Sequence, residues 1–371
     1  MCVPILASIL FLSVLLQGCN PGAKKPGRTA GELRRNPRDG AEMVWVPAGG
    51  FIMGIAGEQW RRDAIASLSM TGSVEFKLIP TGDCETSRDH WVTARVKGQA
   101  RPAKLLLAAG SIMDFPGTRL IRGDICADSG AASRTAVLAA GMLFDHERPQ
   151  HRVYLDGYWI YKQEVTVAQY RGFCKATGRK MPNKPSWGWR DDHPITNVTW
   201  EDAATYAEWA GMSLPTEAQW EKAARGTDGR TYPWGNVWEA SRCATSAGRK
   251  LASPQPAGSH RLDCSPYGAL DMSGNAREWC CDWYDPEYYE NTPSENPPGP
   301  SQGWDIPVGQ GSPDYPGQAQ VEGVKDKTVT SHVLRGGCWS SGNCYHFRCC
   351  YRSFLANGRT DNCGFRCARI P

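Results

Sequence analysis

The stretch Leu214-Pro215-Thr216-Glu217-Ala218-Gln219-Trp220-Glu221 predicts the start of a helix. Thr216 is a suitable N-cap, and Gln219 three residues later completes a capping box, in which each of the two side chains bonds the other residue's backbone N–H. The helix should begin after Pro215 and end near Gly226, because glycine commonly follows the last residue of a helix.

Two more helices are predicted by the same pattern on the N-terminal side of this stretch. Thr166 with Gln169 and Thr199 with Asp202 form capping boxes. The first of these helices should run to about Gly178, again a natural end point. The second places four small or aromatic residues on one face, and it should therefore pack closely against a neighbour. They are Ala203, Tyr206, Ala207 and Ala210.

Strands and loops account for most of the remaining chain. Met43–Pro47 and Phe51–Gly54 indicate two short strands joined by a glycine turn. The chain has 371 residues, of which 15 are Trp and 40 are Gly, a composition that favours a loop-rich fold with a core of large aromatic side chains. We therefore expect a loop-rich fold with few helices and short strands. The net charge of +4 is small and dispersed, which argues against a nucleic-acid-binding protein.

One long segment differs in its sequence pattern from the rest of the chain. From about residue 57 to 145 the Trp-rich, glycine-punctuated pattern of the other segments is missing, and we interpret this segment as an insertion of unknown role. Within it, Trp91–Val96 and Ala103–Leu107 predict a pair of strands. The main domain then consists of residues 41–56 and 146–371.

The N-terminus is typical of an exported protein. A short apolar run from Val3 to Leu16 ends in Leu16-Gln17-Gly18-Cys19 and is too short to cross a membrane. Residues 1–19 resemble a bacterial lipoprotein signal, in which Cys19 becomes the lipidated first residue; the alternative is an ordinary secretory signal. Residues 20–40 are rich in Pro, Gly and Arg and predict a flexible tether. The 15 cysteines also favour an oxidising compartment. We expect a lipoprotein anchored to a membrane on the periplasmic or outer-membrane side.

The ordered motifs of the main domain resemble the formylglycine-generating enzyme (sulfatase-modifying factor) family. The matching segments are Phe51–Gly54, Glu147–Val153, Glu164–Thr166, Pro194–Trp200, Leu214–Glu221, Ala224–Gly226, Tyr232–Gly235, Asp271–Asn275, Glu278–Trp279, Arg335–Gly337 and Gly364–Ala368. This resemblance implies a compact, irregular α+β fold, with few helices and short antiparallel strands, related to that of C-type lectins.

A calcium site is the clearest metal prediction. In Asp271-Met-Ser-Gly-Asn-Ala-Arg-Glu278, a turn with Gly274 separates two carboxylates, and oxygen ligands of this kind suit Ca²⁺. The resemblance implies that Asp271 and Glu278 supply carboxylates and that Gly274 and Ala276 supply backbone carbonyls, for a structural ion. The alternative is a turn in which both acids cap local N–H groups.

Two thiols follow the Arg335-Gly336-Gly337 motif. The family's enzymes use two cysteines here to bind Cu(I), a soft ion that prefers sulfur ligands. Cys344 falls on the second of these positions. Ser340 or Ser341 occupies the place of the first, and Cys338, six residues before Cys344, is the possible substitute. Cys338 and Cys344 could equally form a disulfide, the ordinary expectation for an exported protein.

Other cysteines depart from the family as well. Cys349 and Cys367 match positions that form structural disulfides with helix residues in the family, but Ala224 and Ala207 stand at the helix positions. Once residues 1–18 are removed and Cys19 is acylated, thirteen cysteines remain, so at least one is unpaired or intermolecular.

Two functions remain open at this point. The resemblance implies an oxidoreductase that acts on a sulfur group with oxygen as acceptor and converts a cysteine in a sulfatase segment to formylglycine. The alternative is a non-catalytic exported lipoprotein that keeps the fold to recognise a protein or glycan, because a fold by itself does not determine function.

Overall fold

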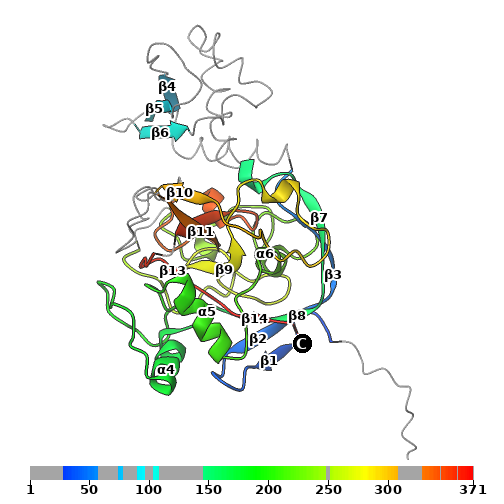
Figure 1. Ribbon diagram of the computed structural model, residues 1–371, viewed down its shortest axis with the longest axis vertical. Coiled ribbons are helices and arrows are strands. Elements are labelled where there is room, and N and C mark those ends of the chain that lie inside the picture. Colours follow the sequence, from blue (N-terminus) through cyan, green and yellow to red (C-terminus); the bar gives the residue numbers. More distant parts are fainter. Residues whose placement is uncertain are drawn as a thin grey trace, which may run out of the picture.

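The computed structural model describes residues 28–56, 145–247, 251–307, 328–342, 344–356 and 358–370, together with three strands between residues 74 and 107. Within these residues, the main domain combines three α-helices with three small sheets, and long loops connect them (Figure 1). This is the irregular α+β fold predicted from the sequence.

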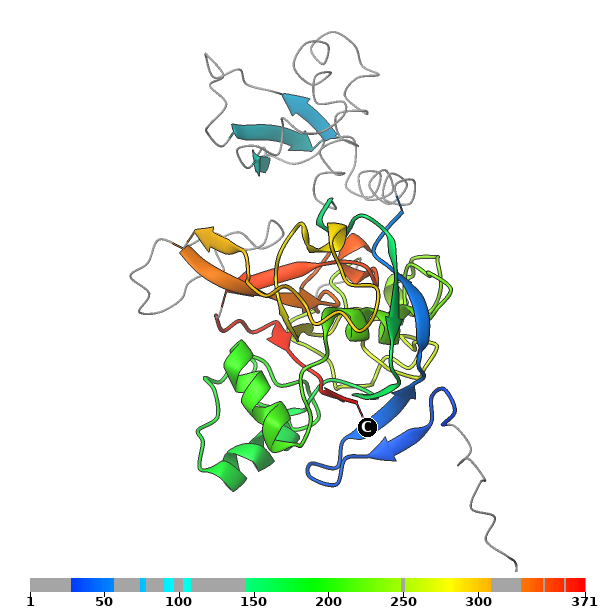
Figure 2. The same cartoon turned by 45° about the vertical axis from the view of Figure 1, so that its right-hand side comes forward.

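One sheet brings the two ends of the described chain together. Its strand order is β1-β2-β8-β14, and all neighbours are antiparallel. The strands are β1 (Leu33–Arg35), β2 (Glu42–Val46), β8 (Tyr158–Tyr161) and β14 (Ala368–Arg369). In both views the C-terminus lies close to β1 and β2 (Figure 2). Because β1 is paired with β2, the predicted tether of residues 20–40 is too long, and its last part belongs to the folded domain.

A second sheet carries most of the motifs of the C-terminal half. Its order is β10-β11-β9-β13, with β12 also paired to β11. The strands are β9 (Arg277–Trp283), β10 (Asp305–Pro307), β11 (Thr328–Arg335), β12 (Ser353–Ala356) and β13 (Cys363–Gly364). The short pairing of β13 with β9 is parallel, and the other pairings are antiparallel. Strands β3 (Gly49–Met53) and β7 (His151–Leu155), which lie on either side of the insertion in the chain, pair in a separate two-stranded sheet.

The three predicted helices are confirmed with their caps. They are α4 (Val167–Thr177), α5 (Trp200–Trp209) and α6 (Glu217–Arg225). Each has the complete capping box, and Gly178 ends α4 in the left-handed conformation with φ 74°. The predicted contact face of α5 is buried, and the helix lies beside α4 in both views (Figures 1 and 2).

Helix α6 lies inside the domain although half of its residues are polar. Its ion pairs compensate this burial: Arg352 donates to both oxygens of Glu217 at 2.8 and 3.0 Å, and Arg225 donates to Glu221 at 2.7 Å. Lys222 donates to the carbonyls of Pro47 and Gly49, at 2.8 and 2.7 Å, which fixes the helix against the β2–β3 turn. Buried charges are tolerated only when paired in this way.

The insertion contains a small sheet of its own. Strands β4 (Val74–Lys77), β5 (His90–Val96) and β6 (Ala103–Leu107) pair in that order, which confirms the predicted β5–β6 pair. Ile55 N–H donates to the carbonyl of Glu147 at 3.0 Å, so the two ends of the insertion leave the main domain side by side. Cys84 and Cys126 lie outside the described residues. Among the described helices, none has the length and apolar character needed to span a membrane.

Candidate functional site

The loop after β11 carries both predicted thiols. Gly336 and Gly337 follow the end of the strand with positive φ angles of 94° and 69°. A Cβ atom on Gly337 would stand 2.8 Å from the carbonyl oxygen of His346, so only glycine fits there. This close approach pins the start of the loop against the segment that follows Cys344.

Cys338 lies in a tight turn at the beginning of this loop. Ser341 N–H donates to the carbonyl of Cys338 at 2.9 Å. The sulfur of Cys338 is 3.3 Å from the hydroxyl oxygens of both Ser340 and Ser341, the two residues that occupy the expected place of the family's first active cysteine. Cys338 is fully buried, so the thiol is enclosed by its own turn.

Cys344 begins the 3-10 helix η4 (Cys344–Phe347) and is 6% exposed. An ion pair of 2.8 Å between Arg348 and Glu147 holds the residues after this helix, and neither side chain is exposed. The structure thus places Cys338 and Cys344 on one loop that is fixed at both ends.

The disulfides expected from the cysteine content are absent among the eleven cysteines that the structure describes. Cys349 instead packs in the same hydrophobic core cluster as Ala224, and Cys367 packs in the same cluster as Ala207. Each thiol thus lies in the same core cluster as one of the two alanines that occupy the helix positions. Alanine there leaves nothing to bond, and the cysteines act as small apolar side chains.

Electrostatics support this packing role. Burial raises the pKa of the Cys349 thiol to about 12, and it raises the pKa of Cys367 well above its usual range. These groups are neutral thiols at physiological pH and are therefore poor nucleophiles and poor metal ligands. Burial also raises the pKa of Cys363, which lies close enough to Cys338 for that thiol to raise it further.

A cluster of buried acids surrounds the predicted calcium turn. Glu164, Asp263 and Asp271 are each at most 1% exposed. Both carboxylate oxygens of Glu164, and one oxygen each of Asp263 and Asp271, have no hydrogen-bond partner among the described residues. Burial raises the pKa of Glu164 and Asp263 well above the usual range, and the charge of Asp271 raises both further.

Glu278 is in a different situation, although it belongs to the same cluster. Arg366 donates to both of its oxygens, at 2.6 and 2.7 Å, and Trp220 Nε1 donates to one of them at 2.7 Å. Glu278 is thus compensated within the protein, whereas Glu164 is not. Within the described ranges, no three side chains of His, Cys, Asp or Glu are arranged so that they alone could hold a metal ion.

The backbone of the turn has the shape needed to present main-chain oxygens. Asp271, Gly274 and Asn275 have positive φ angles of 54°, 98° and 60°. A Cβ atom on Gly274 would stand 2.3 Å from the carbonyl oxygen of Ala244, so the residue must be glycine. A cation at this place would fit the orphaned oxygens of the acids, with carbonyls of the turn completing its ligands.

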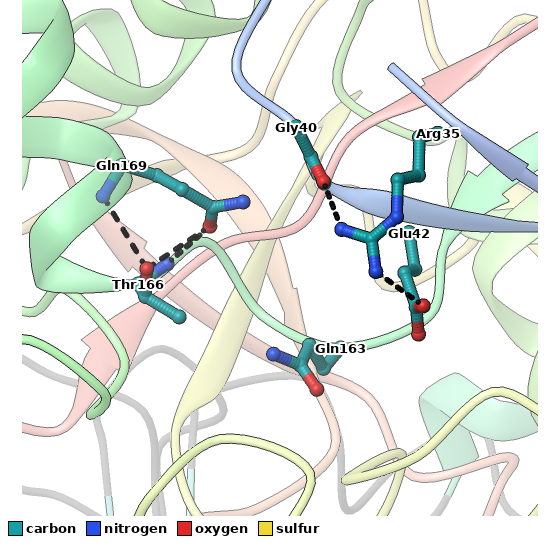
Figure 3. A pocket seen from close by; sticks show the side chains of 7 residues that line it. Arg35, Gly40, Glu42, Gln163, Thr166 and Gln169 are labelled. Carbon is teal, nitrogen blue, oxygen red and sulfur yellow. Dashed lines mark hydrogen bonds and ion pairs between the residues drawn. The ribbon is translucent and has the colours of Figure 1, made fainter.

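A surface pocket of about 350 Å³ lies beside the four-stranded sheet and the start of α4 (Figure 3). It is lined by Arg35, Gly40, Ala41, Glu42, Gln163, Thr166 and Gln169. Arg35 donates hydrogen bonds to the carbonyl of Gly40 and to Glu42 (Figure 3). Thr166 and Gln169 are hydrogen-bonded to each other in the cap of α4. These polar groups are already used, and neither Cys338 nor Cys344 lines the pocket, so we do not assign a reaction to it.

Sequence reasoning missed the acids Glu164 and Asp263 and the aromatic residue Trp187. Glu164 follows the buried strand β8 and directly precedes Val165, which is completely buried. A charged residue next to a fully buried apolar residue is a signal for a buried carboxylate. Trp187 gave no such signal, because only the folded chain brings it 5.3 Å from Trp339.

The sequence of the chain is similar to those of known proteins. Residues 115–371 match the family described as sulfatase-modifying factor enzyme 1-like domain. The chain belongs to this family. A formylglycine-generating enzyme of Streptomyces coelicolor is 29% identical over 67% of this chain and 90% of its own length. Another, from Thermomonospora curvata, is 30% identical over 61% of this chain and 86% of its own length.

The domain also occurs outside such enzymes. A protein of Chlamydia pneumoniae named serine/threonine-protein kinase pkn1 is 31% identical over 60% of this chain but over only 34% of its own length. Among solved structures, PvdO from Pseudomonas aeruginosa has a TM-score of 0.54 and 19% identity, covering 93% of this chain and all of that chain. This likeness shows that the two chains share a fold and carries no information on activity.

Proposed function

We propose that this family member is a copper-dependent oxidase that converts a cysteine of a peptide segment to formylglycine. The observation that carries the proposal is the pair Cys338 and Cys344 on one fixed loop, directly after the Arg335-Gly336-Gly337 motif. Relatives at 29 and 30% identity over most of their length bear the name formylglycine-generating enzyme, which favours this reaction for a member of the family.

Cys338 and Cys344 would hold the copper. Their sulfur atoms are the donor type that Cu(I) prefers. The hydroxyl groups of Ser340 and Ser341 are each 3.3 Å from the sulfur of Cys338 and would lie beside a copper ion bound there. When bound, copper would supply the coupling between thiol oxidation and reduction of O₂.

The overall reaction has a simple balance. The substrate thiol loses two electrons, its carbon–sulfur bond breaks, and the sulfur leaves as hydrogen sulfide while the aldehyde oxygen is gained. O₂ accepts four electrons, so a thiol reductant must supply the other two and become a disulfide. The substrate class is an extended cysteine-containing peptide, such as an unfolded sulfatase segment.

We propose further that the acid cluster holds a structural Ca²⁺. Asp271, Glu278 and the carbonyls of Gly274 and Ala276 form the predicted ligand set, and Glu164 adds a carboxylate with two orphaned oxygens. A divalent cation would neutralise the uncompensated negative charge of these buried acids. It would also stabilise the turn to which the thiol loop is bonded, because Gly274 N–H donates to Gly336 and Trp339 N–H donates to Asn275.

Membrane attachment through Cys19 is also proposed from the sequence, and Cys19 lies outside the described residues. Two or three acyl chains on Cys19 would anchor the protein to a membrane surface. Metabolic labelling with an alkyne fatty acid should mark the wild-type protein and leave Cys19→Ala unmarked. Labelling of both proteins, or of neither, would contradict the proposal.

A second candidate is a binding or scaffold lipoprotein without oxidase activity. It is favoured by the complete burial of Cys338 and by the match to pkn1, a protein of another name that contains the same domain. In this case the acid cluster and the aromatic core would preserve the fold for recognition of a protein or a glycan.

Copper binding separates the two candidates. The reduced protein should bind one equivalent of Cu(I) in competition with a chromogenic chelator, and the single variants Cys338→Ser and Cys344→Ser should each lose this binding. Cys264→Ser is a matched control, because Cys264 is exposed and lies outside the thiol loop. A mapped Cys338–Cys344 disulfide that resists mild reductant, without copper binding, would favour the scaffold function.

A further inference from the structure

A pair of tryptophans flanks the turn that carries Cys338. Trp339 directly follows the cysteine, and Trp187 reaches it from the connection between α4 and α5. Their ring centroids are 5.3 Å apart with an interplanar angle of 81°, an edge-to-face contact. Both side chains are half-buried, so part of each indole faces solvent next to the thiol loop.

The position of Trp339 relative to the thiol is fixed by its backbone. Trp339 N–H donates to the carbonyl of Asn275 at 2.9 Å, and its own carbonyl accepts from the hydroxyl of Ser246 at 2.9 Å. Ser341 closes the turn onto Cys338. These bonds therefore fix the backbone of Trp339 next to Cys338.

One polar atom of this pair has no hydrogen-bond partner among the described residues. The indole Nε1 of Trp339 is buried and donates no hydrogen bond to any described residue. Buried N–H groups in proteins are almost always bonded, to protein, water or ligand. An extended peptide offers main-chain carbonyl oxygens as acceptors at regular intervals.

We propose that Trp187 and Trp339 form the recognition site for an apolar side chain adjacent to the reactive cysteine of the peptide. This inference rests on the proposed oxidase function. Consecutive Cα atoms are only about 3.8 Å apart, so an indole that adjoins Cys338 can reach only the nearest neighbours of the reacting residue. The indole rings contact the apolar side chain, and Trp339 Nε1 donates to a carbonyl of the same peptide. Trp187 and Trp339 are specificity-determining residues and take no part in the electron transfer.

A binding experiment without copper tests this inference. Two fluorescein-labelled peptides carry Ser-x-Pro-x-Arg, with serine in place of the reactive cysteine so that no disulfide forms with the protein. Leucine follows the serine in one peptide and glycine in the other. Fluorescence anisotropy gives the Kd of each peptide for the full chain and for its variants.

The wild-type protein should prefer the leucine peptide, and Trp187→Ala should weaken its binding by about five- to tenfold with little effect on the glycine peptide. Trp187→Phe should retain most of the preference, because it keeps an aromatic ring. Trp304→Ala is the matched control: Trp304 is 44% exposed and packs against Tyr284 and Phe354, outside the thiol loop. Circular dichroism confirms that each variant is folded.

The other outcomes are also decisive. Equal affinity of the wild-type protein for the two peptides would overturn the inference, and so would an unchanged leucine preference in Trp187→Ala; both results leave the proposed oxidase function intact. If the wild-type protein binds neither peptide, the peptide-oxidase function is contradicted, and the inference fails with it.

Discussion

Arg366 donates two hydrogen bonds to Glu278, from Nε at 2.6 Å and from Nη2 at 2.7 Å, and neither side chain is exposed. The same guanidinium also donates to the carbonyls of Tyr161 and Leu270, at 3.0 and 2.8 Å. This one residue therefore connects strand β8, the calcium turn and strand β9. It also supplies a counter-charge to Glu278. The other three buried acids of the cluster, Glu164, Asp263 and Asp271, depend on another partner.

Loss of this connection should be costly. Arg366→Gln should lower the free energy of unfolding by about 3–5 kcal/mol, because it leaves Glu278 buried without its counter-charge. Urea denaturation measures the change. Arg359→Gln is a matched control: its ion pair with Asp202 is partly exposed, and its loss should cost less than about 1 kcal/mol. Equal losses for the two variants would contradict the role given to Arg366.

Calcium should stabilise the protein through the three uncompensated acids. Addition of saturating Ca²⁺ to the EDTA-treated protein should raise the Tm by on the order of 5 °C. Glu164→Gln should raise the Tm of the calcium-free protein, because it removes a carboxyl group whose burial beside Asp271 is unfavourable, and should reduce the gain from calcium. Asp228→Asn, at an exposed pair with Arg230, should change neither value. If Ca²⁺ produces the same shift in Glu164→Gln as in the wild-type protein, Glu164 is not a ligand.

The core should accept the disulfides that this chain lacks. Ala224→Cys should form a disulfide with Cys349, and Ala207→Cys should form one with Cys367, because each pair shares a core cluster. Closure of loops longer than 100 residues should stabilise each oxidised variant by about 2–4 kcal/mol, less any strain in the native state. Peptide mapping identifies the bonds, and the stabilisation should disappear in reductant. Failure of both bonds to form under oxidising conditions would show that the thiols are not at the family positions.

His332 should make the protein sensitive to acid. It is stacked between Trp200 and Trp283, with centroid distances of 4.0 and 3.8 Å, and burial lowers its pKa from 6.5 to about 4. The folded state thus favours the neutral ring. This contribution to stability is complete above pH 6.5 and is lost as the pH falls through 4.

Between pH 7.5 and pH 5 this histidine should therefore cost the wild-type protein about 2 kcal/mol of stability. His332→Phe retains an aromatic ring in the stack and should remove that part of the pH dependence. Urea denaturation of both proteins at the two pH values measures it. His260→Phe is the control, because His260 lies in the loop before Arg261, outside the stack. The same slope in His332→Phe as in the wild-type protein would rule out this histidine as the cause.

The parts of the fold that the sequence predicted correctly are those with local signals. Capping boxes locate all three helices, because the Thr and Gln or Asp side chains bond the backbone within one turn. The β5–β6 pair of the insertion was predicted in the same way, from short runs of strand-forming residues. Strand β1 was missed because its residues Leu33–Arg35 are all exposed, and an edge strand of this kind has no alternation of buried and exposed positions.

The candidate site could be predicted only in part. Cys344 and the Asp271–Glu278 turn were found through ordered motifs, but the acid cluster depends on residues that are more than 100 positions apart in the chain, such as Glu164 and Asp271. Their proximity is a property of the tertiary structure. The disulfide expectation failed for a similar reason, since a count of cysteines contains no information on which side chains meet in the core.

The most direct test of the account is conversion of a peptide by the purified protein. The chain is supplied with Cu(I), O₂ and a thiol reductant, and a Cys-x-Pro-x-Arg peptide is analysed by mass spectrometry. We predict the loss of mass that accompanies conversion of the thiol to an aldehyde, trapping of the product by a hydrazine reagent, and no product with Cys344→Ser, while Cys264→Ser behaves as the wild-type protein. Absence of the aldehyde from the wild-type reaction, in protein shown to contain copper, would contradict the proposed oxidase function.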